Sequence, residues 1–276
     1  MSKLHVYKYQ GAGNDFVVVD NRRGQADFLT PVQINRLCDR RFGVGADGLM
    51  TLDAGGAADF RMRYYNADGY EGTMCGNGGR CLVAFAARMG IAKYDFTACD
   101  GPHSAEVLSR EGDRCIVRLK MRDVARLDWL PDGCLLDTGS THFVQWVDDL
   151  PRYDVDGEGK RLRWDERFPH GANVNFVEVF PDHLAVRTYE RGVEAETWAC
   201  GTGATASAIA SYAHGAACFT RSEADPLRVR FTVHAPGGHL AVDFIPAEDG
   251  SFHDVWLTGP ATPVFETDID PDDLSN

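Results

Sequence analysis

The sequence lacks the charge and hydrophobic patterns of nucleic-acid-binding and membrane proteins. Its 276 residues carry a formal net charge of −13, without a basic stripe or an arginine cluster. This balance argues against nucleic acid as the main partner and against anionic membrane surfaces. No apolar run approaches the length that crosses a bilayer, and the first residues do not have the pattern of a signal peptide. We therefore expect a cytoplasmic protein with neither a nucleic-acid nor a membrane partner.

Motifs for metals and common cofactors are missing too. The chain has eight cysteines but no C-x-x-C pair, which disfavours a structural zinc site. It has no H-E-x-x-H, no P-loop and no G-x-G-x-x-G that follows a strand and opens a helix. We expect no metal and no cofactor. A chain of this length without export signals needs no disulfide frame. Six cysteines are therefore expected to be small buried hydrophobic residues: Cys38, Cys81, Cys99, Cys115, Cys134 and Cys218.

The other two cysteines open two similar segments. Cys75–Gly90 and Cys200–Gly215 are both sixteen residues long, begin with C-G-x-G and end in glycine after an alanine-rich stretch. At the same offset of 125, Tyr64 matches Tyr189, and further matches upstream keep the same order at offsets of 126 and 127. Single short matches of glycine and alanine arise easily by chance. An ordered series favours internal duplication.

The duplication predicts two pseudo-symmetric halves. We expect an α+β fold in which each half is a mainly antiparallel sheet or barrel around one central helix. The predicted N-terminal half covers residues 1–124 and carries Cys75, and the predicted C-terminal half covers residues 125–258 and carries Cys200. The segment 259–276 is a candidate to complete the first half. Within it, we expect the acidic stretch from Glu266 to Asp273 to be a solvated end outside the fold.

Local patterns predict the helices and strands of both halves. Thr30 followed by Pro31 predicts a helix start, with Ile34, Leu37 and Cys38 on one face. The segments 76–89 and 201–214 have helical composition, and a glycine that can end a helix follows each. Short runs rich in β-branched and aromatic residues predict strands, most of them too closely spaced for crossover helices. These runs are 16–20, 60–65, 115–120, 143–147, 174–179, 185–189, 229–233 and 255–258.

Cys75 and Cys200 each stand directly before a predicted helix, with glycines around them. The first turn of a helix presents backbone N–H groups without intrahelical partners and a partial positive charge. That environment favours a thiolate at neutral pH, and glycines let a ligand approach the backbone closely. C-G-x-G at a helix start therefore provides a reactive sulfur and a site for an anion such as a carboxylate.

Two such sites at equivalent positions of a duplicated fold favour a reaction that inverts a stereocentre. Inversion needs one group that removes a proton from one face of a carbon and another that delivers a proton to the opposite face. A lone base tends to return the proton to the side that it left. A pseudo-two-fold axis would turn the two helix starts toward one another. Cys75 and Cys200 would then act as thiolate and thiol and exchange roles with the direction of the reaction.

At these residues the chain resembles diaminopimelate epimerase. The resemblance covers both halves, from the N-terminus to about residue 215, and its segments follow the order of the family. The segments are Gly11–Phe16 (GAGNDF), Gly43–Gly48 (GVGADG), Asn66–Gly69 (NADG), Met74–Cys81 (MCGNGGRC), and Glu190–Gly192 ahead of Ala199–Gly203 (ACGTG).

The resemblance implies an isomerase that interconverts LL- and meso-2,6-diaminopimelate in lysine biosynthesis without pyridoxal phosphate. Its partner is then a small-molecule substrate, a diamino dicarboxylic acid, and a homodimer is one oligomeric state that the sequence allows. Matching residue by residue, the catalytic set comprises Cys75, Cys200, Glu190 and His142. Backbone N–H groups of Gly76, Asn77, Gly201 and Thr202 would hold the reacting carboxylate, and Asn14, Asn66, Asn173 and Arg191 would bind the distal end of the substrate. Glu190, beside the catalytic centre, would also contact the substrate.

Departures from the family pattern keep alternatives open. The family commonly has Asn-Pro-His where this chain has Ser140, Thr141 and His142. One alternative is therefore a cofactor-independent racemase of another small amino acid, such as proline or hydroxyproline, although proline racemases usually carry histidine where this chain has Asn77. A thiol-redox protein is a second alternative, and a non-catalytic amino-acid-binding module is the third.

Overall fold

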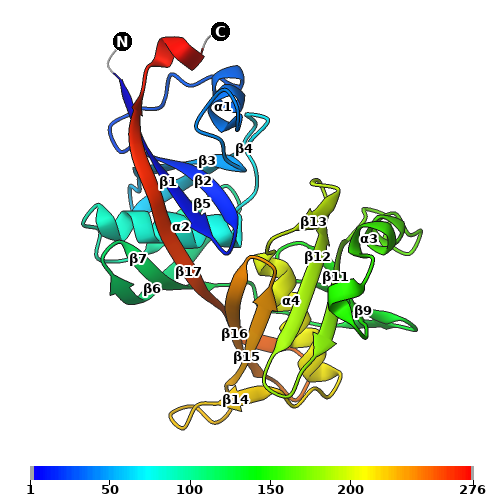
Figure 1. The fold of residues 1–276 in the computed structure, drawn as a ribbon. Coiled ribbons are helices and arrows are strands. Elements are labelled where there is room, and N and C mark those ends of the chain that lie inside the picture. The colour runs from blue at the N-terminus through cyan, green and yellow to red at the C-terminus, as the bar shows by residue number, and fades with distance from the viewer. Residues whose placement is uncertain (1–2, 275–276) are drawn as a thin grey trace. The chain divides into compact units, whose positions relative to one another are not determined.

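The computed structural model describes residues 3–274. By its contacts the chain divides into two compact units: unit 1, Met1–Leu119 together with Gly259–Asn276, and unit 2, Lys120–Thr258. The last strand, β17 (Phe252–Ile269), contributes residues to both units (Figure 1). Within the described residues, no helix is long and apolar enough to span a membrane.

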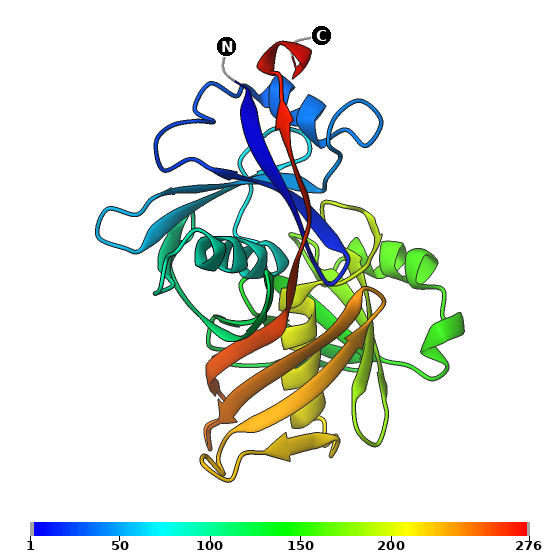
Figure 2. The same ribbon diagram turned by 60° about the vertical axis from the view of Figure 1, so that its left-hand side comes forward.

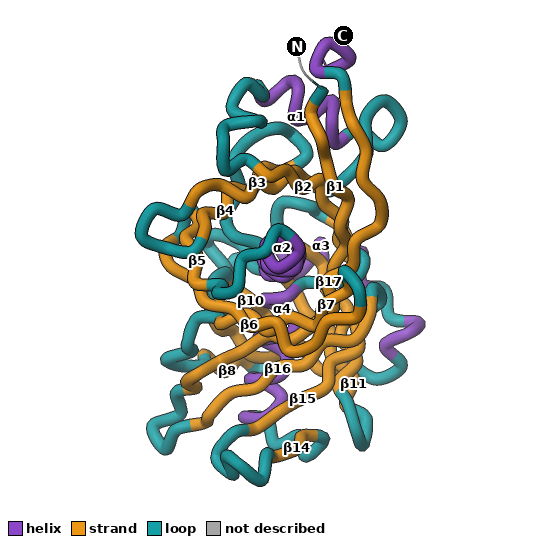
Figure 3. Tube along the Cα trace, turned by 90° about the vertical axis from the view of Figure 1, so that its left-hand side faces the viewer, coloured by secondary structure: helices purple, strands orange, loops and turns teal. Residues whose placement is uncertain are grey.

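Unit 1 is a ring of strands around one long helix. Neighbouring strands pair in the order β1-β2-β3-β4-β5-β6-β7, and β17 pairs with both β7 and β1 to close the ring. The helix α2 (Gly76–Arg88) packs against β1, β2, β3, β4 and β6, and Figure 3 views it end-on with these strands around it. The strands are β1 (Leu4–Gly11), β2 (Asn14–Asp20), β3 (Gly48–Ala54), β4 (Phe60–Asn66), β5 (Asp95–Ala98), β6 (Gly101–Glu111) and β7 (Arg114–Lys120).

Unit 2 repeats this plan around the helix α4 (Gly201–Ala213). Its main sheet has the order β9-β10-β11-β12-β15-β16-β17, and α4 packs against β9, β10, β11, β12, β15 and β16. Figure 2 shows α4 alongside β15 and β16. The strands are β8 (Asp128–Leu130), β9 (Gly133–Asp137), β10 (Thr141–Trp146), β11 (Asn173–Val179), β12 (Leu184–Glu190), β13 (Ala195–Thr197), β14 (Phe219–Arg221), β15 (Val229–Ala235) and β16 (Gly238–Pro246).

The predicted fold class is confirmed. Most strand pairs are antiparallel, and the parallel pairs occur at equivalent places: β2 with β3 and β4 with β5 in unit 1, β10 with β11 and β12 with β15 in unit 2. The helices α2 and α4 begin and end within one residue of their predicted bounds. Gly90 and Gly215 follow them with φ of 82° and 97°, a backbone conformation that favours glycine.

A second, shorter helix in each unit adds to the predicted plan. The helix α1 (Pro31–Cys38) has the predicted N-cap Thr30 and buries the predicted face. The helix α3 (Val155–Arg163) was not predicted, because Gly157 and Gly159 interrupt its helical pattern. The two helices lie in the connections between β2 and β3 and between β10 and β11, which supply the crossovers that parallel pairs need.

The prediction that the acidic C-terminal stretch lies outside the fold is wrong. Residues 262–269 pair with β1, and Leu274 is 3% exposed in the core of unit 1. The acidic side chains still reach partners at the surface: Glu266 bonds to Arg88 at 2.7 Å and Asp268 to His5 at 2.7 Å. The segment 262–269 is held by its pairing with β1 and not by burial of its own side chains, and composition alone does not reveal such pairing.

One cysteine also departs from its predicted burial. Five of the six cysteines expected to be structural are buried, but Cys99 is exposed and donates to the carbonyl of Gly72 at 3.3 Å. Burial raises the pKa of Cys38, Cys81 and Cys134 to about 12. These three thiols are therefore protonated at neutral pH. Cys75 and Cys200 differ from them in being only half-buried.

Candidate active site

The predicted catalytic cysteines are the N-cap residues of the two central helices. Cys75 has φ −101° and ψ 125°, Cys200 has φ −110° and ψ 114°, and neither sulfur caps its own helix. The first helical hydrogen bonds run from Gly79 N to Cys75 O (2.7 Å) and from Ala204 N to Cys200 O (2.8 Å). The N–H groups ahead of these bonds include those of Gly76, Asn77, Gly201 and Thr202, which were predicted to hold a carboxylate. Both helix starts thus have the backbone geometry of an anion site.

In unit 1, Asn14 lies beside Cys75. The Cys75 thiol donates to Asn14 Oδ1 at 3.6 Å, and Asn77 Nδ2 donates to the same oxygen at 3.4 Å. The other end of the Asn14 amide donates to Asp47 Oδ2, and Arg40 holds that carboxylate at 2.8 Å. The structure therefore brings together three of the predicted residues of unit 1 and adds Asp47 as the group that orients Asn14.

Arg80 lies inside the first turns of α2 and is 0% exposed. Its guanidinium donates to Gly76 O at 3.3 Å and to Asn77 Oδ1 at 3.0 Å. Burial lowers the pKa of Arg80, while the thiols of Cys81 and Cys75 oppose that shift. The buried cation thus fixes the helix start at which a carboxylate is expected. Arg80 lies within a segment that carried the resemblance, but it was not singled out as a site residue.

Replacing Arg80 by methionine should separate stability from activity. Methionine fills a similar volume without a desolvated charge, so the free energy of unfolding should change by about 2 kcal/mol or less. The Asn77 amide oxygen loses the hydrogen bond that Arg80 donates to it, and a small misplacement at a reacting centre can cost about 100-fold in rate. We expect kcat to fall by about 10- to 100-fold while the urea midpoint changes little. Arg80→Lys is the control, and an Arg80→Met variant with full activity would contradict this role.

In unit 2, the predicted residues converge on Thr202. Cys200 Sγ lies 3.5 Å from Thr202 Oγ1, and His142 Nε2 lies 2.9 Å from the same hydroxyl oxygen. Ser140 Oγ is 2.9 Å from His142 Nε2 and 3.4 Å from Thr202 Oγ1. The serine that departs from the family pattern thus belongs to the same cluster. By the family resemblance, His142 was expected near the two catalytic sulfurs, and within unit 2 the Thr202 hydroxyl connects it to Cys200.

His142 is neutral in the folded state. It is 0% exposed, and burial lowers its pKa to about 3, although its hydrogen bond with Asn175 acts in the opposite direction. The charges of Asp137 and Arg191 act on it with opposite signs. A neutral imidazole has one N–H donor and one acceptor nitrogen. His142 therefore donates a hydrogen bond from one ring nitrogen and accepts one at the other.

Burial of neutral His142 predicts a pH-dependent stability. The folded-state pKa lies below the ordinary value of 6.5. Its contribution is therefore fully present above about pH 6.5 and is lost as the pH falls toward the folded-state value. We expect the wild type to lose about 2 kcal/mol more than His142→Gln between about pH 6.5 and pH 5. Urea unfolding at the two pH values measures this difference, and parallel pH profiles of the two proteins would contradict it.

The residues predicted for the distal end of the substrate differ in accessibility. Asn173 is 5% exposed, and its amide is engaged by Ser140 Oγ at 3.3 Å, Thr141 O at 3.1 Å and Arg191 N at 2.9 Å. It therefore shapes the backbone on which Arg191 sits. Arg191 is exposed, and Nη1 donates to His170 O at 3.2 Å.

Two further predicted residues lie at strand ends. Asn66 is exposed at the end of β4, where its backbone N–H bonds to Tyr70 O at 2.9 Å. Glu190 ends β12 and accepts a hydrogen bond from Thr197 Oγ1 at 2.5 Å. Strand ends next to turns are positions from which a side chain can meet a ligand.

Sequence reasoning missed Asn175 and Thr188. Asn175 is 0% exposed and bonds to His142 Nδ1 at 3.1 Å, and Thr188 Oγ1 donates to Asn175 Oδ1 at 3.0 Å. The signal for Asn175 was a second asparagine, two residues after Asn173, in a buried run of a largely apolar strand. A polar residue in such a place needs hydrogen-bond partners.

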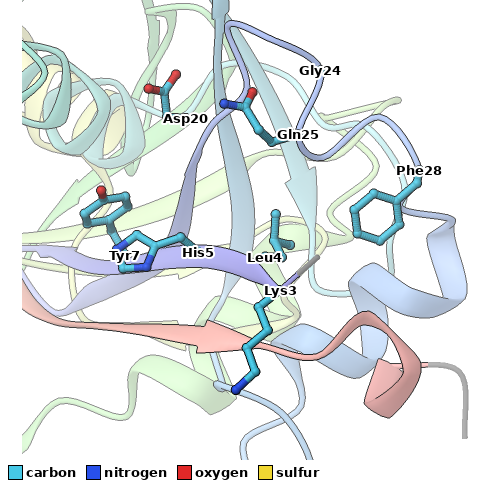
Figure 4. Close-up of a pocket in the computed structure, with 8 residues that line it drawn as sticks. All are labelled: Lys3, Leu4, His5, Tyr7, Asp20, Gly24, Gln25 and Phe28. Carbon is cyan, nitrogen blue, oxygen red and sulfur yellow. The ribbon is translucent and has the colours of Figure 1, made fainter. Parts of the chain in front are cut away.

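A cavity in unit 1 lies apart from the predicted site residues. It has a volume of about 600 Å³ and contains none of those residues (Figure 4). It is lined by Lys3, Leu4, His5, Tyr7, Asp20, Gly24, Gln25 and Phe28. Among residues 3–274, no group of three or more His, Cys, Asp or Glu side chains is arranged to hold a metal ion.

Comparisons with known proteins match this chain to one family. The family model for diaminopimelate epimerase matches residues 6–121 and 134–262. A diaminopimelate epimerase of Flavobacterium psychrophilum is 46% identical over 270 residues, covering 96% of this chain and 100% of the relative. One of Chlorobaculum tepidum is 44% identical, covering 94% and 98%.

Solved structures with low sequence identity share the fold. A phenazine-biosynthesis protein of Bacillus anthracis superposes with a TM-score of 0.70 at 18% identity, covering 98% of this chain and 100% of that one. A hydroxyproline epimerase of Agrobacterium vitis, with bound trans-4-hydroxy-L-proline, gives a TM-score of 0.67 at 16% identity, covering 99% and 96%.

Proposed function

The chain belongs to the diaminopimelate epimerase family, and from this premise we propose that Cys75 and Cys200 perform its reaction as a thiolate–thiol pair. The enzyme is an isomerase that interconverts LL- and meso-2,6-diaminopimelate. The observation that carries the two-thiol proposal is the matched position of the two cysteines, each the N-cap residue of a central helix.

The proposed reaction transfers one proton off and one proton onto the same α-carbon. A thiolate removes the α-hydrogen from one face and becomes a thiol. The opposite thiol delivers its proton to the other face and becomes a thiolate, so charge and protons balance. The reverse direction uses the same groups with exchanged roles.

The helix starts are proposed to hold the reacting carboxylate. Backbone N–H groups of Gly76, Asn77, Gly201 and Thr202 precede or open the first turns of α2 and α4. Negative charge develops on that carboxylate as the α-carbon loses its proton, and helix N-termini stabilise such charge. The helix N-termini thus make it easier for the thiolate to remove the α-proton.

We propose that the remaining polar residues recognise the distal amino-acid end of the substrate. Arg191 is an exposed guanidinium that can bind a carboxylate with two hydrogen bonds. Asn14 and Asn66 offer amide groups that contact carboxylate or ammonium without adding charge, and Asn173, whose amide is engaged within unit 2, positions the backbone of Arg191. Glu190 provides a carboxylate for an ammonium group.

Incubation of the purified protein with LL-diaminopimelate in D₂O tests the function. We expect a mixture of LL and meso forms with deuterium at one α-carbon, in the presence of a chelator and of hydroxylamine, because the proposed reaction uses neither a metal nor a carbonyl cofactor. A panel with proline and hydroxyproline separates the racemase alternative. Absence of α-deuterium in diaminopimelate would overturn the function.

We also propose that the two units derive from one duplicated half. The equivalent order of parallel and antiparallel pairs supports this, and the predicted boundary after residue 124 falls between β7 and β8. A cytoplasmic location and a homodimer complete the proposal. Sedimentation of the full chain at several concentrations tests the oligomeric state.

A further inference from the structure

We infer that Asn175 is a positioning residue that sets the hydrogen-bond direction at Cys200, so that the free enzyme holds Cys200 as the thiolate and Cys75 as the thiol. The inference rests on the proposed function for its chemical meaning. It is carried by the hydrogen bonds within each unit, whose donors and acceptors can be assigned one at a time.

The orientation of the Asn175 amide is fixed by two neighbours. Its Nδ2 lies 3.1 Å from the carbonyl of Phe143, which only accepts hydrogen bonds. Its Oδ1 accepts from Thr188 Oγ1 at 3.0 Å. A flipped amide would place oxygen against oxygen at Phe143, so nitrogen faces that carbonyl.

The oriented amide selects one tautomer of His142. The second hydrogen of Asn175 Nδ2 points to His142 Nδ1 at 3.1 Å. Nδ1 is therefore the acceptor, and the proton of the neutral imidazole is on Nε2. Both side chains are 0% exposed, so water does not compete with this arrangement.

Hydrogen bonds then converge on Thr202. His142 Nε2–H faces Thr202 Oγ1 and Ser140 Oγ, each at 2.9 Å. Ser140 Oγ accepts from Asn173 Nδ2 at 3.3 Å, and its own hydrogen can reach Thr202 Oγ1 at 3.4 Å. With its lone pairs engaged, Thr202 directs its hydroxyl hydrogen to Cys200 Sγ at 3.5 Å. A donor facing sulfur favours the thiolate.

At Cys75 the hydrogen bond runs in the opposite direction, from the sulfur to its partner. The carboxylate of Asp47 accepts from Asn14 Nδ2, from the backbone N–H of Asp15 at 3.2 Å and from Arg40 at 2.8 Å. Asn14 therefore turns its oxygen toward Cys75, at 3.6 Å from the sulfur. An amide oxygen cannot donate, so this contact is made only by the protonated thiol.

Nearby charges act on Cys75 and on His142 in addition to these hydrogen bonds. In unit 1 the guanidinium of Arg80 interacts electrostatically with Cys75 and favours a thiolate there, while its donors are directed to Gly76 O and Asn77 Oδ1. In unit 2, Asp137 and Arg191 act on His142 with opposite signs. The inference is that the hydrogen bonds to the sulfurs, which differ in direction, outweigh the effect of Arg80.

Alkylation of the free enzyme tests the assignment. The rate of iodoacetamide labelling is measured separately for the Cys75 and Cys200 peptides by mass spectrometry, under reducing conditions and across pH. We expect Cys200 to reach half of its maximal rate at a lower pH than Cys75. Equal midpoints, or a lower midpoint for Cys75, would overturn the assignment.

Two substitutions test whether Asn175 causes the difference between the labelling midpoints of Cys200 and Cys75. Asn175→Leu removes the donor to His142 at similar size, and we expect the Cys200 midpoint to rise by about one pH unit, with about tenfold slower labelling at neutral pH. The Cys75 midpoint should not move. Thr188→Val is the matched control, because Phe143 O still holds the amide nitrogen, and it should leave the Cys200 midpoint within the error of the wild type. A wild-type midpoint in Asn175→Leu would overturn the positioning role.

The tautomer can be measured without any substitution at Asn175. Nitrogen-15 spectra of histidine-labelled enzyme, assigned with His142→Gln, should show His142 protonated on Nε2 alone. Protonation on Nδ1 would contradict the inference even if Asn175→Leu does not fold. If Cys75 and Cys200 label with the expected difference in pH midpoint but the protein exchanges no α-hydrogen, only the proposed function is contradicted. If the protein exchanges the α-hydrogen but the two cysteines have equal midpoints, only this inference is contradicted.

Discussion

Alanine in place of Cys75 or Cys200 is expected to abolish epimerisation in both directions. Each variant loses either the base or the acid that a given direction requires, and positioned acid–base groups contribute about 10²- to 10⁴-fold in rate. We expect kcat to fall by about 10³-fold or more for LL to meso and for meso to LL. The measurement is the initial rate of each diastereomer's formation by chromatography.

The chain offers a matched control for these variants. Cys99 is an exposed thiol of unit 1, and Cys99→Ala should keep full activity. This control separates loss of a catalytic sulfur from general effects of removing a thiol. If Cys200→Ala kept more than about a tenth of the rate in both directions, the two-thiol mechanism would be wrong.

Gly203→Ala is expected to have the second-largest effect. A Cβ on Gly203 would lie 2.3 Å from Asn175 Oδ1 and 3.1 Å and 3.3 Å from the Cβ and Sγ atoms of Cys200. Contacts this short force Asn175 or Cys200 to move. Overpacking of this kind costs about 1–3 kcal/mol of stability, and displacement of a catalytic sulfur can cost about 100-fold in rate.

Gly215→Ala provides the control at the other end of the same helix. Its φ of +97° is strained for alanine, but nothing lies within 4 Å of the added Cβ. The expected result is a loss of about 1 kcal/mol in the free energy of unfolding with unchanged kcat. Urea unfolding and steady-state kinetics on both variants separate the two effects, and normal activity in Gly203→Ala would show that the close approach is not needed.

The helix starts at the candidate site could be predicted because they depend on local sequence. C-G-x-G followed by an alanine-rich stretch fixes an N-cap, a permissive first turn and a helix in each unit. The duplication then identified equivalent positions. The local sequence and the internal repeat were therefore sufficient to predict Cys75 and Cys200 as candidate site residues.

The network behind the cysteines could not be predicted, because it depends on strand pairing. His142 meets Asn173 across the parallel pair of β10 and β11, and this register also brings Asn175 to the imidazole. Thr188 reaches Asn175 through the antiparallel pair of β11 and β12. These strands are separated by turns and by α3, whose glycines conceal it. The acidic end of β17 escaped prediction for the same reason, since its partner is β1 at the opposite end of the chain.

The central claim is that two thiols act on one carbon from opposite faces, and isotope exchange in the single-sulfur variants tests it most directly. Cys75→Ser and Cys200→Ser are each incubated in D₂O with LL- and with meso-diaminopimelate, and α-deuterium is measured before any inversion accumulates. Each variant should exchange one diastereomer at the reacting carbon, and the two variants should choose opposite diastereomers. Exchange of the same diastereomer by both variants would contradict the claim.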